Sequence, residues 1–195
     1  MKIKKYKESY SKKVNKKPIK NKKRMDVLWI LFISIIAFLI SISFSFISEY
    51  IILNQEGFIA LLFIIIFILL GIVFDMIGVS ITVADINTFN SMAAKRVRGA
   101  NIAVKLIRNN EKASSFCNDV IGDICGIVSG SAGVSLATNI SESYNYDLFI
   151  TTLIITALIA SITIGGKALG KITAINKSTN ILYRFSRIIS LFYKF

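Results

Sequence analysis

The 195-residue sequence contains no histidine, only one proline and only two cysteines. Without histidine, neither a zinc site built on imidazole nor general-base catalysis by a histidine is available. Cys117 and Cys125 lie on one predicted helix, separated by about 12 Å along its axis at the α-helical rise. They cannot form a disulfide with each other, so we interpret both as packing residues.

Charged residues are missing from three long hydrophobic ranges, 27–48, 57–74 and 148–166. Each range is close to the roughly 20 residues that a membrane-spanning helix needs. A fourth range, 116–138, is less hydrophobic because it includes two aspartates and several glycines. The pattern predicts an all-α integral membrane protein with four transmembrane helices.

Lysine and arginine are absent from residues 25–94 and 113–166. They fall instead into three basic groups, in residues 2–24, 95–112 and 167–194. The loops without a positive charge carry acidic residues, namely Glu49, Glu56, Glu142 and Asp147. This asymmetry is the positive-inside pattern. With four spans it predicts a multi-pass cell-membrane protein whose basic groups and two termini all lie in the cytosol.

Three basic segments flank the predicted spans. We expect residues 1–25 to be a disordered cytosolic arm that attracts anionic lipids of the inner leaflet. No aromatic-interleaved or folded nucleic-acid-binding module accompanies this arm, so we expect no nucleic-acid partner. Residues 86–112 and 173–195 predict amphipathic juxtamembrane helices, the first of them broken near Gly99. The alternative is that both segments are only flanks of the spans with snorkelling basic side chains.

Two aspartates, Asp119 and Asp123, lie in the third predicted span. At about 100° per residue, they share one face with small residues, namely Gly122, Gly126, Gly130 and Gly133. The opposite face is apolar and is expected to contact lipid; it carries Val120, Ile121, Ile124, Ile127 and Val128. A GxxxGxxxG series allows another helix to approach closely. The pattern therefore predicts helix packing through Gly122, Gly126 and Gly130, with both aspartates pointing into the protein.

A third aspartate, Asp75, lies about 27 Å along the second span at 1.5 Å per residue, which is compatible with the depth of Asp123. We expect these carboxylates to share one membrane level without a basic partner inside the membrane. A buried carboxylate must be protonated, paired or bound to a cation. With the oxygens of Ser80 and Asn118, the carboxylates predict a site for a hard cation such as Mg²⁺. The alternative is that they cap helix ends or face water, above all Asp119.

The range 71–137 contains two short motifs, "VRGA" at Val97–Ala100 and "IGD" at Ile121–Asp123. With them the sequence resembles the transmembrane domain of the CNNM/CorC (cyclin M) magnesium and cobalt transporters, which include CorB. The resemblance implies a homodimer with an ion site that opens to the cytosol. It places Asp123 where the family has its ion-coordinating asparagine, and Gly78–Ser80 where the family has a Ser/Glu/Thr cluster.

On this resemblance, residues 26–172 are a CNNM-like transmembrane domain with an additional first helix, followed by the C-terminal helix at 173–195. The sequence departs from the family in three ways. The ending "TIGGKALGK" lacks the family's glutamate and proline, Val79 replaces an acidic residue, and residues up to Phe195 contain no CBS-pair domain.

Two functions follow as alternatives. The first is binding and transport of a divalent cation, Mg²⁺ or Co²⁺, with Asp123, Asp75 and Ser80 as ligands and Asp119 near the entry. The second is a non-transporting adaptor or partner subunit that retains the fold. An intramembrane aspartyl protease is disfavoured, because "VIGD" at Val120–Asp123 lacks the first glycine of the GxGD motif. We therefore expect no enzymatic activity.

Overall fold

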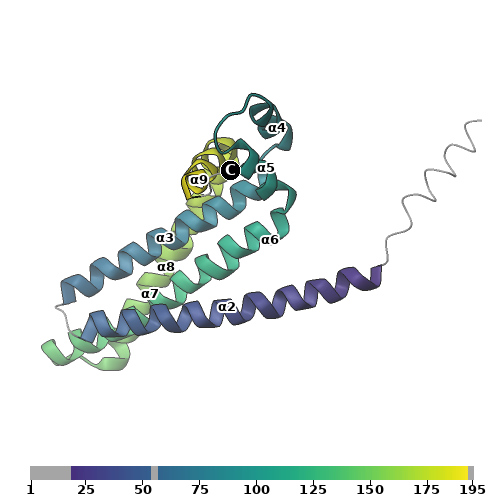
Figure 1. Ribbon diagram of the computed structural model, residues 1–195. Helices are drawn as coiled ribbons and strands as arrows, with labels where there is room; N and C mark the ends of the chain where they lie inside the picture. The colour runs from purple at the N-terminus through teal and green to yellow at the C-terminus, as the bar shows by residue number, and fades with distance from the viewer. Residues whose placement is uncertain (1–18, 54–56, 193–195) are drawn as a thin grey trace, which may run out of the picture. The chain divides into compact units, whose positions relative to one another are not determined.

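The computed structural model describes residues 19–53 and 57–192, which are helical apart from short turns (Figure 1). The elements in chain order are α2 (Ile19–Leu53), α3 (Gly57–Val83), α4 (Ile86–Ala94), α5 (Ala100–Arg108), α6 (Asn110–Ser115), the π-helix η1 (Phe116–Gly122), α7 (Asp123–Tyr144), α8 (Leu148–Asn176) and α9 (Ser178–Phe192). The chain divides within α2, between Ile36 and Ala37, into two units. The packing described below is that of the second unit.

Within the described residues, four helical stretches are long and apolar enough to cross a membrane: Val27–Ser48, Phe58–Val83, Asn110–Tyr144 and Leu148–Asn176. The prediction of four such helices is confirmed, although the helices extend beyond the predicted ranges. The third stretch joins α6, η1 and α7 into one continuous helix. The fourth runs past Gly166 to Asn176, and this extension decides the environment of the aspartates.

The first unit contains the beginning of α2, which starts at Ile19. The predicted disordered arm, residues 1–25, is therefore wrong for residues 19–25, while residues 1–18 lie outside the described part of the chain. Lysine and arginine have high helix propensity, so the helix of the apolar span continues backwards through this basic stretch. Trp29 and Phe32 lie on this helix with ring centroids 6.2 Å apart.

Helices α3, α7 and α8 pack against one another and form the centre of the second unit. An apolar cluster joins α3 to α7 through Ala60, Ile64, Ile68, Ala132 and Leu136. Between apolar helices in lipid, close van der Waals packing replaces the hydrophobic effect as the driving force. Small residues allow this packing: a Cβ added at Gly71 would lie 3.2 Å from the Cβ of Cys125 and 3.4 Å from the carbonyl oxygen of Gly122.

The packing face of α7 differs from the predicted one. Val120, Ile124 and Val128 are buried, whereas Asp119 and Asp123 are exposed. A Cβ added at Gly126 or Gly130 would meet no atom within 4 Å. No described helix of this chain therefore packs closely on Gly126 or Gly130, whereas Gly122 and Gly133 are buried. The two faces are distinguishable in the sequence, but which of them meets a neighbour depends on the small residues that α3 presents.

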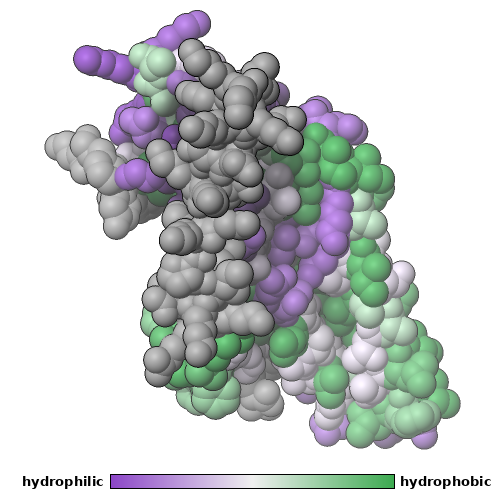
Figure 2. Space-filling model, turned by 90° about the vertical axis from the view of Figure 1, so that its right-hand side faces the viewer, coloured by the Kyte–Doolittle hydropathy of each residue, from purple (hydrophilic) through white to green (hydrophobic). Residues whose placement is uncertain are grey.

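A second apolar cluster packs α4, α5 and α9 around the end of α3, through Ile77, Ile81, Ala84, Phe89, Ala103, Cys117 and Leu182. We call this part, together with the C-terminal end of α8, the basic end. The predicted segments are helical as α4, α5, α6 and α9, and the predicted break near Gly99 separates α4 from α5. Residues 173–176 belong to α8 and not to the C-terminal helix, and a place at the membrane surface stays a prediction. Figure 2 shows hydrophilic surface at the top of the visible face and in a band near its middle, and hydrophobic surface along its right-hand side.

Asp85 begins α4 as its N-cap. Its carboxylate accepts hydrogen bonds from the backbone N–H groups of Asn87 and Thr88 and from the Thr88 hydroxyl. The N–H of Asn87 and then the hydroxyl of Thr88 lower the pKa of Asp85 below its usual value, because they stabilise the ionised form. This aspartate therefore has a structural role in starting the helix.

The contact between α3 and η1 can be tested by enlarging Gly71. The variant Gly71→Leu places a side chain against the backbone of Gly122, so we expect a loss of about 1–3 kcal/mol of stability. The matched control Gly126→Leu adds the same side chain where nothing is close, and we expect its unfolding midpoint to match wild type. Thermal unfolding in detergent micelles measures both. Equal destabilisation by the two variants would show that a neighbour covers the Gly126 face.

Candidate functional site

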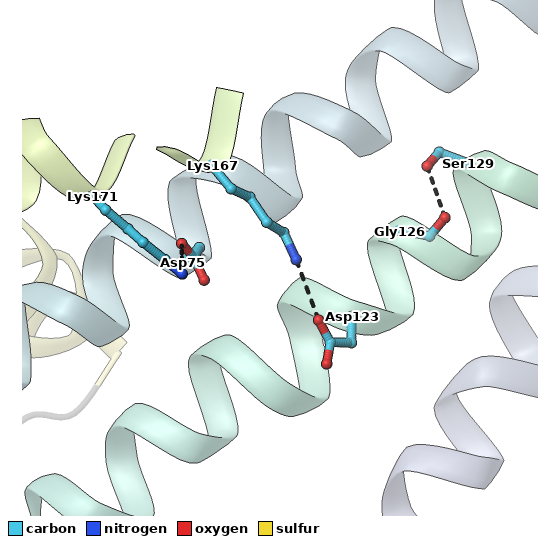
Figure 3. A network of polar contacts seen from close by, with 6 residues as sticks. All are labelled: Asp75, Asp123, Gly126, Ser129, Lys167 and Lys171. Atoms are coloured by element: carbon cyan, nitrogen blue, oxygen red, sulfur yellow. Dashed lines mark hydrogen bonds and ion pairs between the residues drawn. The ribbon is translucent and has the colours of Figure 1, made fainter. Parts of the chain in front are cut away.

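Two lysines of α8 form ion pairs with two of the predicted site aspartates (Figure 3). Lys167 Nζ donates a hydrogen bond to Asp123 Oδ1 at 3.2 Å. Lys171 Nζ lies 3.9 Å from Asp75 Oδ2. Residues four apart share one face of a helix, so both lysines extend from α8 in the same direction. The prediction that these carboxylates lack a basic partner is wrong.

The lysines reach the aspartates because α8 continues beyond the predicted span. Asp75 is about 27 Å from the start of α3, and Lys167 is about 28 Å from the start of α8, at 1.5 Å per residue. In a four-span topology these two helices run in the same direction across the membrane. Counting residues along the fourth span would therefore have placed Lys167 at about the depth of Asp75 from the sequence alone.

The two ion pairs differ in which partner is the more buried one. In the first pair the Asp75 side chain is 7% exposed and Lys171 is 54% exposed. In the second pair the order is reversed, with Asp123 at 64% and Lys167 at 20%. An exposed pair contributes at most about 1 kcal/mol. Removing the partner of a buried carboxylate costs more stability, because close partners must replace the hydration that the carboxylate has lost.

Three buried oxygens have no hydrogen-bond partner within the described residues: Asp75 Oδ2, Ser80 Oγ and Asn118 Oδ1. All three belong to residues that the sequence analysis assigned to the site. Other buried serines are satisfied, since the Ser129 hydroxyl donates to the carbonyl of Gly126 (Figure 3). An unsatisfied buried polar group costs about 1–3 kcal/mol. Such exceptions are few in native structures and require an explanation, for which a bound ion is one.

Asn118 lies on η1 with its amide oxygen against Gly78 of α3. A Cβ at Gly78 would overlap with Asn118 Oδ1, so only glycine leaves room for this side chain. Asp75 precedes Gly78 by three residues, which is nearly one helical turn. The carboxylate and the amide oxygen therefore lie along the same face of α3. Because η1 is a π-helix, it belongs to a class of distortions that is frequent at functional sites.

The remaining predicted site residues are not brought to this face. Ser80 follows Gly78 by two residues, which places it about 200° around α3. Asp119 is exposed on η1, and Asp123 is exposed beside Lys167. Across residues 19–53 and 57–192, no group of three or more His, Cys, Asp or Glu side chains could hold a metal ion. Asp75, Asp119 and Asp123 thus do not form one three-carboxylate site.

The oxygen pair of Asp75 and Asn118 has the chemistry of a site for a hard cation. A carboxylate and an amide carbonyl are ligands of Mg²⁺ and Ca²⁺, and Mg²⁺ keeps several of its waters when it binds. The two cysteines are buried and free, as expected for packing residues. Lys171 competes with any cation for Asp75 Oδ2.

Comparison with known proteins finds no matching family model, no matching curated protein and no matching solved structure. The resemblance to the CNNM/CorC transmembrane domain therefore stays a prediction. The class that the described residues define is an all-helical protein with four helices able to span a membrane by length and composition.

The unequal burial of the two ion pairs predicts unequal effects of removing their lysines. Lys171→Met leaves the buried Asp75 carboxylate without a cation, and we expect a loss of about 1–3 kcal/mol of stability. Lys167→Met removes the partner of a carboxylate that the protein does not enclose, so we expect a smaller loss of stability than in Lys171→Met. Chemical unfolding in detergent micelles measures both variants. A larger loss for Lys167→Met would contradict the assignment of Asp75 as the buried partner.

Proposed function

We propose that this chain is a multi-pass membrane protein that binds a hard divalent cation between α3 and η1 and transports it. The observation that carries the proposal is the pair of buried oxygens, Asp75 Oδ2 and Asn118 Oδ1, which lack hydrogen-bond partners on one face of α3. A cation between them would supply the missing partner to both. An ionisable group within a membrane-spanning helix marks an ion or substrate pathway by default.

Mg²⁺ and Co²⁺ are the ions that we propose. One carboxylate, one amide oxygen and retained waters fit the way Mg²⁺ binds in proteins. Lys171 would have to leave Asp75 for the ion to enter, and its half-exposed side chain has room to do so. The site lies at the basic end, which the positive-inside pattern assigns to the cytosol. Entry from that side, a homodimer and a role for Asp123 as ligand remain proposals that rest on the resemblance.

A second function is favoured by the ion pairs themselves. Asp75 and Asp123 each have a lysine partner on α8, so both carboxylates are neutralised without an ion. In this case the pairs hold α8 against α3 and α7, and the chain is a non-transporting adaptor or partner subunit. The two functions differ in whether a divalent cation displaces Lys171.

Binding and flux of Mg²⁺ separate the two functions. We expect the purified wild-type chain to bind Mg²⁺ in calorimetry and to move it into vesicles that contain a magnesium-sensitive dye. Asp75→Asn keeps the shape and removes the charge, and we expect it to weaken binding about tenfold or more, which corresponds to about 1.4 kcal/mol. We expect Asn118→Ala to weaken binding in the same direction.

Two further variants control the experiment. Asp119→Asn removes one charge from an exposed neighbour of Asn118, and we expect binding like wild type. Asp123→Asn distinguishes the site at Asp75 from a site centred on Asp123, since a loss only in Asp123→Asn would move the ligand assignment there. A wild-type chain that neither binds nor moves Mg²⁺ or Co²⁺ would refute the transport proposal in favour of the adaptor.

A further inference from the structure

A cavity of about 640 Å³ lies at the basic end, lined by the C-terminal part of α4, the turn at residues 96–99, α5 and Ser190 of α9. Four of its lining side chains are cationic: Arg96, Arg98, Lys105 and Arg108. Asn101 and Ser190 add neutral polar groups, and Val97, Ile102 and Val104 form an apolar wall. This cavity does not include Asp75 or Asn118, so it is separate from the proposed cation site.

Among the described residues that line the cavity, none is an aspartate or a glutamate. Within residues 19–53 and 57–192, neither the pair of Lys167 nor the pair of Lys171 involves any of the three arginines. Arginines gathered around one hollow repel each other unless an anion neutralises them. The electrostatics of the cavity therefore favour an anionic ligand.

The backbone around the cavity is held in an unusual conformation. Arg96 has a φ of 56° and Gly99 a φ of 86°, and a non-glycine residue in the left-handed region persists only where its surroundings impose it. The N–H of Arg96 donates to the Ala93 carbonyl at 2.9 Å, and that of Val97 to the Met92 carbonyl at 3.0 Å. These bonds hold Arg96 and Arg98 at the edge of the cavity.

Helix α5 and helix α9 close the cavity from two sides. Gly99 lies directly on α9, because a Cβ added there would be 3.0 Å from the backbone of Arg187. Helix α5 begins at Ala100 without a side-chain cap, so the positive end of its dipole adjoins the arginines. Ala100 and Ala103 are buried, which turns the face that carries Lys105 and Arg108 outward.

We propose that this cavity binds a phosphate-bearing anion. The guanidinium group is planar and binds phosphate oxygens through two parallel hydrogen bonds, and three arginines supply several such donors. The volume falls within the range of about 300–1,000 Å³ that is usual for small-ligand sites. The phosphate can come from a lipid headgroup, which the apolar wall and the flanking membrane spans accommodate, or from a soluble polyphosphate.

Binding is tested with the full chain in nanodiscs and a pair of double variants. Arg98→Gln with Arg108→Gln removes two charges from the cavity, whereas Arg184→Gln with Lys177→Gln removes two exposed charges of the basic end that do not line it. One arm counts retained phosphatidic acid by native mass spectrometry against phosphatidylcholine alone. The other arm titrates pyrophosphate by calorimetry in phosphatidylcholine nanodiscs.

We expect the cavity variant to weaken binding about tenfold or more in at least one arm, while the control variant stays close to wild type. A loss in the lipid arm alone assigns the phosphate to a headgroup, and a loss in the pyrophosphate arm assigns it to a soluble ligand. The proposal is overturned if neither probe binds the wild type or if both double variants lose binding equally. Unchanged unfolding midpoints confirm that the variants are folded.

Discussion

The structure depends on how closely the backbone of α3 approaches its neighbours. Gly71 lies against the carbonyl of Gly122, and Gly170 of α8 lies so close to α3 that an added Cβ would be 2.9 Å from Met76 Cγ. In an apolar surrounding, this contact supplies the attraction that burial from water supplies elsewhere. Because α3 is held between η1 and α8, Asp75 faces the lysines of α8 and Gly78 receives the amide of Asn118.

At the basic end, each of the two ion pairs joins a more buried partner to a more exposed one. Asp75 is buried and its lysine reaches outward, whereas Asp123 is exposed and its lysine is the more buried partner. A pair 3.9 Å apart and without a hydrogen bond leaves the Asp75 carboxylate weakly compensated. In the proposed function, this weak compensation is what would let a small hard cation compete with Lys171, and it links the helix packing to that proposal.

The same end of the molecule separates two kinds of electrostatic environment. Between α3 and η1, unsatisfied oxygens favour a cation, while the cavity beside α5 gathers arginines that favour an anion. The Gly99 turn lines the cavity, lies between α4 and α5 and packs on α9. The helix break that the sequence predicts at Gly99 is therefore also what shapes the cavity.

The sequence by itself determined the four long apolar helices, the amphipathic helices with their break at Gly99, and the unpaired role of the two cysteines. These follow from local composition and helical periodicity, which neighbouring residues specify. It also identified Asp75, Ser80 and Asn118, because polar groups in apolar runs are conspicuous. Only the tertiary structure decided that Val120, Ile124 and Val128 pack inward while Ile127 is exposed, since that choice depends on which small residues of α3 and α8 lie opposite. It also decided that Lys167 and Lys171 pair with the aspartates, because depth along a helix can place a lysine at the level of an aspartate, but only the packing of the helices sets the distance between the two side chains.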